Sequence, residues 1–199
     1  YASKLYQSIN TNEAKSALAR VEQNRSNVLR NLGRFAESIE TVKNAMMMHQ
    51  ASGQTAGMAR AKQSLALTYF VLGRWNESLK LLDEVREAFF ADGRRRDAVL
   101  VDLYISDCLL QLRRFGDVLE KCEETKSLFA EFGTEFEVGQ SILNRAIAFA
   151  GLNLHEQALA SLSEARDCFT REGNDVWVAS TDLETGVILL RQGKSAESY

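Results

Sequence analysis

The chain has 199 residues, 45% of them hydrophobic, and a formal net charge of −3. This length and apolar content can supply a continuous core and exclude a disordered chain, and the slightly acidic balance gives no general attraction to nucleic acid. No apolar run reaches the roughly 18 residues of a membrane span, and the N-terminus shows no signal-peptide pattern. We therefore expect a cytoplasmic protein that binds neither nucleic acid nor membranes.

Cysteine and histidine usage predicts no metal and no cofactor. Cys108, Cys122 and Cys168 form no CxxC pair, and their odd number argues against a disulfide framework, so we expect small buried hydrophobic side chains. His49 and His155 are far apart in the sequence, and neither lies near ligand residues at metal spacing.

Glycine marks a period of forty residues, the signature of solenoids in which each unit buries its apolar face against its neighbours. The two marker series are Gly53, Gly93, Gly133 and Gly173, and Gly33, Gly73, Arg113, Asn153 and Gly193. The predicted units are a partial second helix at 1–12, repeats at about 13–53, 54–93, 94–133 and 134–173, and a partial repeat at 174–199. Neither end shows a polar capping helix, so we expect one solenoid segment of a longer protein.

These markers predict how the helices end. Glycine just past a helix end adopts the left-handed conformation at no steric cost. The chain has no proline that could end a helix instead. Asn153 can adopt the same conformation, whereas for Arg113 it costs on the order of 1 kcal/mol. We therefore expect a differently shaped turn at Arg113.

The second repeat shows the helical pattern most clearly. Apolar residues recur at three-to-four spacing on both sides of Gly73, which predicts two antiparallel helices of about 17 residues joined by a short turn. The two stripes are Ala61, Leu65, Ala66, Tyr69 and Leu72, and then Trp75, Leu79, Leu82, Val85 and Phe89.

Large residues also recur between repeats. The position two residues after the inner turn holds Phe35, Trp75, Phe115 and then His155. Near the end of each second helix, Phe89, Phe129 and Phe169 are in the same column as His49. Stacked repeats need such columns because each unit makes the same contact with its neighbour.

The segment LGRWNESL at Leu72–Leu79, preceded by Leu65, Ala66 and Tyr69, resembles the central motif of the tetratricopeptide repeat (TPR). The resemblance covers essentially the whole chain and implies an all-α fold, a right-handed superhelical solenoid of antiparallel helix pairs. The repeat of forty residues instead of thirty-four is similar to arrays in bacterial caspase-like CHAT proteins, maltose-regulator-type activators and Pins-type adaptors. The segment EGNDVWVA at Glu172–Ala179 looks most like the CHAT-associated arrays.

The TPR resemblance also implies a concave groove lined by the first helix of each repeat. Its lining begins polar and basic and then becomes apolar. The implied groove residues are Arg20, Gln23, Asn27 and Arg30, then Arg60, Gln63, Leu67 and Phe70, then Leu100, Leu103, Asp107 and Leu110, then Leu143 and Ile147, and finally Leu183 and Val187.

Two interpretations of the groove leucines stay open. They are ordinary core residues if the first helices are buried on every side, as helices that are apolar all round usually are. Otherwise they form an apolar floor that suits an amphipathic helix or an extended peptide with acidic residues at one end. Another part of the same parent protein could fill the groove instead. Binding of chaperone tails is disfavoured, because Leu67 and Asp107 follow Asn27 where a carboxylate clamp needs donors.

No catalytic constellation is visible. The chain has no GxSxG elbow, no phosphate-binding glycine loop and no HExxH motif, and His155 stands in an aromatic column. We therefore predict a protein-interaction module without enzymatic activity. We expect the regulatory or sensor arm of a larger signalling or effector protein, with a CHAT-type protease favoured. The alternative is a purely structural scaffold or oligomerisation spacer whose groove is filled intramolecularly.

Overall fold

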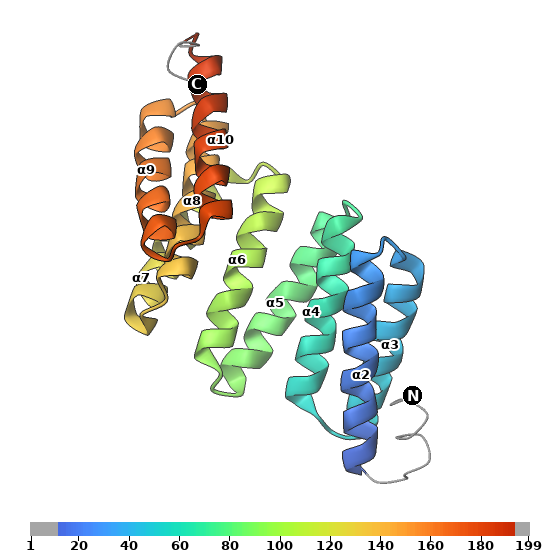
Figure 1. Ribbon diagram of the computed structural model, residues 1–199. Helices are drawn as coiled ribbons and strands as arrows, with labels where there is room; N and C mark the ends of the chain where they lie inside the picture. Colours follow the sequence, from blue (N-terminus) through green and yellow to red (C-terminus); the bar gives the residue numbers. More distant parts are fainter. Residues whose placement is uncertain (1–11, 194–199) are drawn as a thin grey trace. The chain divides into compact units, whose positions relative to one another are not determined.

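The computed structural model describes residues 12–193, and this part of the chain is entirely α-helical (Figure 1). Residues 1–11 of the predicted partial helix, and the last six residues of the predicted partial repeat, lie outside the described residues. The helices are α2 (Asn12–Asn31), α3 (Phe35–Ala51), α4 (Thr55–Val71), α5 (Trp75–Ala91), α6 (Arg95–Gln111), α7 (Phe115–Phe132), α8 (Glu135–Gly151), α9 (His155–Arg171) and α10 (Asp175–Arg191).

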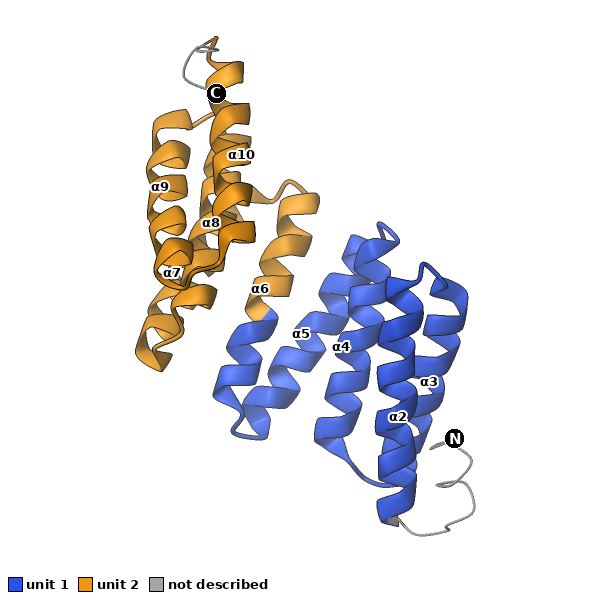
Figure 2. Cartoon of the chain, viewed as in Figure 1, with its two compact units in different colours: residues 1–101 blue, residues 102–199 orange. Residues whose placement is uncertain are grey.

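The chain forms two compact units, residues 1–101 and 102–199, and the boundary falls within α6 (Figure 2). In unit 1, each of α2, α3 and α4 packs against the helix that follows it, and α2 also contacts α4. In unit 2, α7 to α10 pack in the same sequential way, and α8 also contacts α10. Sequential helix pairs whose first helices also touch are the TPR-like arrangement that the sequence predicts.

Small buried residues allow the two helices of a pair to approach closely. In unit 1, the hydroxyl of Ser38 donates to the backbone carbonyl of Ser26 at 2.9 Å. In the same way, the hydroxyl of Ser78 donates to the backbone carbonyl of Ala66 at 2.8 Å. In unit 2, Ala146 and Ala158 are the corresponding residues, and both are fully buried. The hydroxyl bonds satisfy polar groups that would otherwise be buried without partners.

The column near the end of the second helices is buried in both units, as predicted. Phe129 and Phe169 are fully buried, and Phe89 and His49 are only 2% and 1% exposed. In unit 2, Phe169 also stacks with Trp177, at 5.4 Å between ring centroids. Gly139 makes room for Phe169, because a Cβ there would lie 2.8 Å from the ring.

The turn at Arg113 corrects one prediction. Arg113 has φ of 57°, so it adopts the same left-handed conformation as Gly73, whose φ is 73°. The backbone hydrogen bonds are also the same. In both turns, the N–H of this residue donates to the carbonyl three residues earlier at 3.0 Å, and the N–H of the following residue donates to the carbonyl five residues before it at 2.9 Å. The two turn bonds, with the Arg113 guanidinium 5.6 Å from the Phe115 ring centroid, offset the cost of the conformation.

We predict that Arg113→Gly raises the free energy of unfolding of the chain by about 0.5 kcal/mol, because it relieves the left-handed strain of about 1 kcal/mol but makes the unfolded chain more flexible. The reciprocal change Gly73→Arg should lower it by a similar amount. Urea unfolding followed by circular dichroism measures both. Equal destabilisation by both substitutions would show that the Arg113 side chain contributes more than its backbone strain costs.

Candidate functional site

The eight predicted groove residues of the first two repeats lie on α2 and α4, two contacting helices that present a common surface in unit 1. We call this surface the first-helix face. It consists of Arg20, Gln23, Asn27 and Arg30 on α2, and Arg60, Gln63, Leu67 and Phe70 on α4. Arg20 and Arg60 are exposed, and the other six residues are half-buried.

Ser64 joins the polar row of α2 to α4. The Gln23 amide donates to the Ser64 hydroxyl at 3.4 Å, and the Arg30 guanidinium donates to the Ser64 carbonyl at 3.4 Å. The same guanidinium donates to the Asn27 carbonyl oxygen at 3.3 Å. These contacts hold Arg30 against the helix pair, so its positive charge has a defined place on the first-helix face. The sequence analysis did not single out Ser64, although it directly follows the predicted groove residue Gln63.

Apolar side chains continue the face along α4. Leu67 and Phe70 follow Gln63 at intervals of four and three residues, which places them on the same side of the helix. The neighbouring Val71 is 56% exposed. The first-helix face of unit 1 therefore combines cationic groups with accessible apolar surface.

The equivalent residues of the later repeats differ in exposure. Leu103 and Leu143 are buried, with 8% and 5% of their surface exposed, whereas Leu183 on α10 is 68% exposed. Leu100, Leu110, Ile147 and Val187 are half-buried. The burial of Leu103 and Leu143 fits the core interpretation that the sequence left open for these two residues.

Unit 2 contains a polar pair that the sequence analysis identified only in part. The amide of Asn144 on α8 donates to the carboxylate of Asp107 on α6 at 3.0 Å, and Asn144 is 9% exposed. Burial raises the pKa of Asp107 to about 6. The hydrogen bond from Asn144 lowers this pKa, but by less than burial raises it. Asn144 lies one helical turn before Ile147, and Ile147 is the counterpart of Asp107 one repeat later. This closeness to a predicted groove residue was the feature of the sequence that could have identified Asn144.

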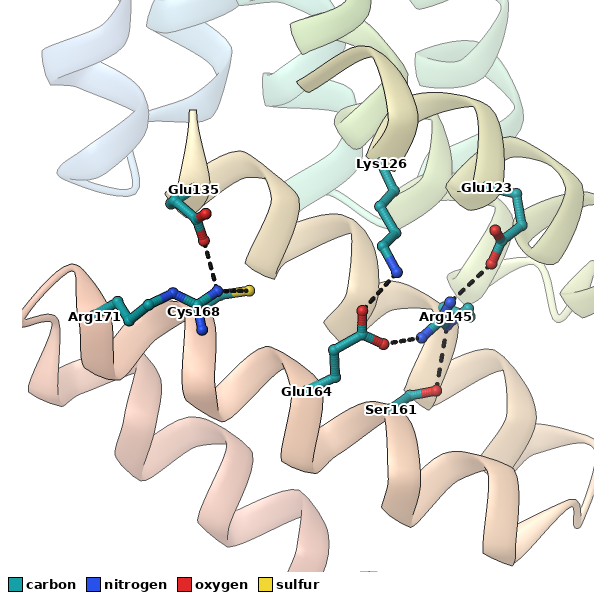
Figure 3. Close-up of polar contacts among 8 residues, drawn as sticks. All are labelled: Glu123, Lys126, Glu135, Arg145, Ser161, Glu164, Cys168 and Arg171. Atoms are coloured by element: carbon teal, nitrogen blue, oxygen red, sulfur yellow. Dashed lines mark hydrogen bonds and ion pairs between the residues drawn. The ribbon is translucent and has the colours of Figure 1, made fainter. Parts of the chain in front are cut away.

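A second polar network in unit 2 joins α7, α8 and α9 (Figure 3). Arg145 donates to Glu164 at 2.6 Å and to Glu123 at 2.8 Å, and Lys126 donates to Glu164 at 2.5 Å. Burial alone would raise the pKa of Glu164, but the bonds from Lys126 and Arg145 outweigh it and lower that pKa. The Arg145 side chain is only 15% exposed, so this network fixes how the three helices pack.

The cysteines are free and buried, as predicted. Burial raises the pKa of Cys122 to about 12 and also raises the pKa of Cys168, so both thiols are protonated at neutral pH and are poor nucleophiles. Within residues 12–193, no group of three histidine, cysteine, aspartate or glutamate side chains is placed to hold a metal ion. No described helix combines the length and apolarity needed to cross a membrane.

Comparison with known proteins identifies the fold but not a family, since no family model matches the chain. Protein KINESIN LIGHT CHAIN-RELATED 3 of Arabidopsis thaliana is 22% identical over 173 residues, which cover 84% of this chain and 27% of that protein. The chain thus spans about a quarter of the length of this curated relative.

Solved structures share the fold at low sequence identity. Aspartyl phosphate phosphatase F from Bacillus subtilis matches with a TM-score of 0.83 and 11% identity, over 92% of this chain and 48% of that chain. A Rap protein complexed with competence and sporulation factor matches with a TM-score of 0.76 and 14% identity, over 97% of this chain and 54% of that chain. The chain is therefore a TPR-like repeat protein, and it spans about half of each of these structures.

The raised pKa of Asp107 predicts a pH dependence of stability. The folded chain holds a proton on Asp107 up to about pH 6, whereas the unfolded chain loses it near pH 3.8, so the free energy of unfolding should fall as pH rises between these values. Asp107→Asn removes the ionisation. We expect this variant to be more stable than the parent by about 1–3 kcal/mol at pH 7.5 and to lose the advantage below pH 4. Urea unfolding across this pH range measures the difference, and a constant difference would contradict the assignment.

For the Arg145 network, we predict that Glu164→Gln lowers the free energy of unfolding by about 1–2 kcal/mol at pH 7, because the largely buried Arg145 then keeps one carboxylate, Glu123, beside the hydroxyl of Ser161. Because the pKa of Glu164 is lowered by folding, its ionised form stabilises the folded chain at pH values above its unfolded pKa. This stabilisation is lost as pH falls through its folded pKa. The variant and the parent should therefore converge in acid. Glu120→Gln, at an exposed position on α7, is the matched control and should change little.

Proposed function

We propose that this chain is a protein-interaction module without catalytic activity, and that the first-helix face of unit 1 binds a peptide or helix of a partner protein. The observation that carries the proposal is the combination on one surface of Arg20, Arg60 and the bonded Arg30 with the apolar side chains of Leu67 and Phe70. A ligand that matches it carries acidic residues next to apolar ones.

The charges favour this class of partner. Arg20 and Arg60 are exposed, so their guanidinium groups are accessible to a carboxylate of a ligand. Such a contact attracts an acidic ligand at long range, while Leu67 and Phe70 supply apolar area to bury. An amphipathic helix and an extended peptide both offer this alternation of side chains.

The fold supports the proposal by analogy. The Rap protein of similar fold is complexed with competence and sporulation factor, and we take this complex as the analogy for ligand binding by the present array. In the same way, we propose that this array is the regulatory or sensor arm of a larger protein. The segment Glu172–Ala179 favours a CHAT-type caspase-like domain as the attached effector. The sequence of the full parent chain tests this part, and a parent without an effector domain would contradict it.

The alternative function is a structural scaffold or oligomerisation spacer whose groove is filled by another part of the same protein. The burial of Leu103 and Leu143 favours it, because these two side chains have little surface left for a ligand. The two functions make different predictions for unit 1. A scaffold does not need Arg20 or Arg60, whereas a peptide-binding face loses affinity without them.

We predict that peptides selected by phage display against the purified chain contain acidic residues next to apolar ones. Their affinity should fall at least about tenfold for Arg20→Glu/Arg60→Glu, because each substitution turns an attractive charge into a repulsive one. Fluorescence anisotropy of a labelled selected peptide measures the affinity.

The control for this experiment is Lys43→Glu/Lys80→Glu. It makes the same change of charge at exposed positions on the second helices α3 and α5, away from the first-helix face. Peptide affinity should change less than about twofold, through long-range charge alone. Equal losses in the two double variants, or selected peptides without acidic residues, would reject the first-helix face of unit 1 as the binding site.

A further inference from the structure

The connection between the first and second repeats contains a buried histidine. His49 lies in the last turn of α3, and its side chain is only 1% exposed. Neither imidazole nitrogen is exposed to water or has a hydrogen-bond partner among the described residues. Gly57, near the start of α4, leaves room for the ring, since a Cβ there would lie 2.3 Å from Nδ1. The ring is therefore held between α3 and the backbone of α4.

The backbone of His49 holds the turn that joins these two helices. Its carbonyl accepts the N–H of Gln54 at 3.0 Å and the hydroxyl of Ser52 at 3.2 Å. The side-chain oxygen of Gln54 in turn accepts the hydroxyl of Ser16 on α2 at 2.7 Å. We call this turn, together with the contact of His49 and Gly57, the α3–α4 joint. Because one residue supplies both the packed ring and the carbonyl, a movement of the His49 ring out of its column loosens the whole joint.

The later repeats show that such a joint does not require a titratable side chain. Phe89, Phe129 and Phe169 occupy the same column and are buried. Their carbonyls accept the same bond, from the N–H five residues later, at 2.8, 3.1 and 2.9 Å. Histidine in the first repeat keeps this packing and adds a group that can bind a proton near neutral pH.

A proton on His49 is incompatible with the closed joint. The neutral imidazole already lacks partners for one donor and one acceptor, and the protonated ring would bury a positive charge as well. Burying a charge without a partner costs far more than burying a neutral polar group. Both nitrogens are shielded within the joint, so the ring can be hydrated and protonated only when it leaves the column.

The charged groups around the ring do not compensate a proton there. Arg20 on α2 is a cation and opposes a second positive charge. Lys62 on α4 and Glu84 on α5 line the cleft beside the ring, and they pair with one another at 2.6 Å. Burial, and to a smaller extent the charge of Arg20, therefore lower the pKa of His49 from its ordinary value of 6.5.

We propose that the α3–α4 joint is an acid-sensitive switch, closed around the neutral ring of His49 and opened when that ring takes up a proton. Because the pKa of His49 is lower in the closed form than in the open form, the closed form is fully favoured above about pH 6.5. Its advantage is lost progressively as pH falls from there to the pKa of the closed form. The equivalent joint between α7 and α8 in unit 2 has Phe129 in the column and should not respond.

Hydrogen exchange of the whole chain, followed by mass spectrometry at pH 7.5 and pH 5.0, tests the switch. At each pH, rates are divided by those of the unfolded chain, which removes the direct effect of pH on exchange. We expect amides of residues 50–58 to exchange at least about threefold faster at pH 5.0, with an upper limit of about thirtyfold if the open form titrates at pH 6.5 and the closed form takes up no proton. Amides of residues 130–138, in the α7–α8 joint, should change less than about twofold.

Two matched variants identify the responsible residue. His49→Phe introduces the residue of the three later repeats, and it should abolish the acceleration at residues 50–58. His155→Phe removes the other histidine, in the column that Phe35 and Phe115 share, and should leave the acceleration unchanged. Gly57→Ala forces the ring out of its column without a proton. We expect it to accelerate exchange of the α3–α4 joint at least about threefold already at pH 7.5.

Histidine NMR gives a second readout that does not depend on exchange rates. The chain has only two histidines, so the His49 imidazole signals are those that His49→Phe removes. We expect these signals to titrate with a midpoint below pH 6.5 in the parent chain.

Any of four results would overturn the switch. They are an α3–α4 joint that exchanges equally at both pH values, an equal acceleration in His49→Phe, an equal acceleration of both joints, and a His49 midpoint at or above pH 6.5. None of the substituted residues belongs to the first-helix face, and no measurement uses a peptide, so failure here leaves the peptide-binding proposal untouched.

Discussion

The close approach of the two helices within each pair is the constraint on which the rest of the structure depends. Every such crossing that lies within one unit is built from small, fully buried residues, and any larger side chain there would push the helices apart. The crossing fixes which side of each first helix faces its partner and which side is left for other contacts. The residues are Ser26 with Ser38, Ala66 with Ser78, and Ala146 with Ala158.

Much of the fold could be predicted from the sequence because its determinants are local and repeat every forty residues. Glycine at a left-handed turn and apolar residues at helical spacing each report on a few neighbouring residues, so the helix pairs and the buried column of Phe89, Phe129 and Phe169 followed from counting. The turn at Arg113 could not be predicted. The backbone cost of that residue is visible in the sequence, but the bonds that offset it depend on the finished turn.

The candidate site was less predictable, because exposure depends on contacts between helices distant in the sequence. Leu143 and Leu183 occupy the same repeat position, yet one is 5% and the other 68% exposed. No local pattern distinguishes them. Similarly, the bond between Asp107 and Asn144 joins residues 37 apart, and the donor lies one turn away from the position that strict repeat counting indicates. The TPR resemblance identified which face of each helix to inspect, but not which of its residues are accessible.

A repeat array makes departures from its own pattern informative, since the other repeats show what packing alone requires. Some departures are resolved within the chain: Arg113 replaces a glycine, and the bonds of its turn offset the strain. His49 is different, because the ring fills its column as a phenylalanine would, while its two nitrogens find no partner among the described residues. Gly57 makes room for that ring, since a Cβ there would lie 2.3 Å from Nδ1 of His49. Arg113 is thus accommodated by the backbone bonds of its turn, whereas His49 is accommodated by the absence of a side chain at Gly57 on the neighbouring helix.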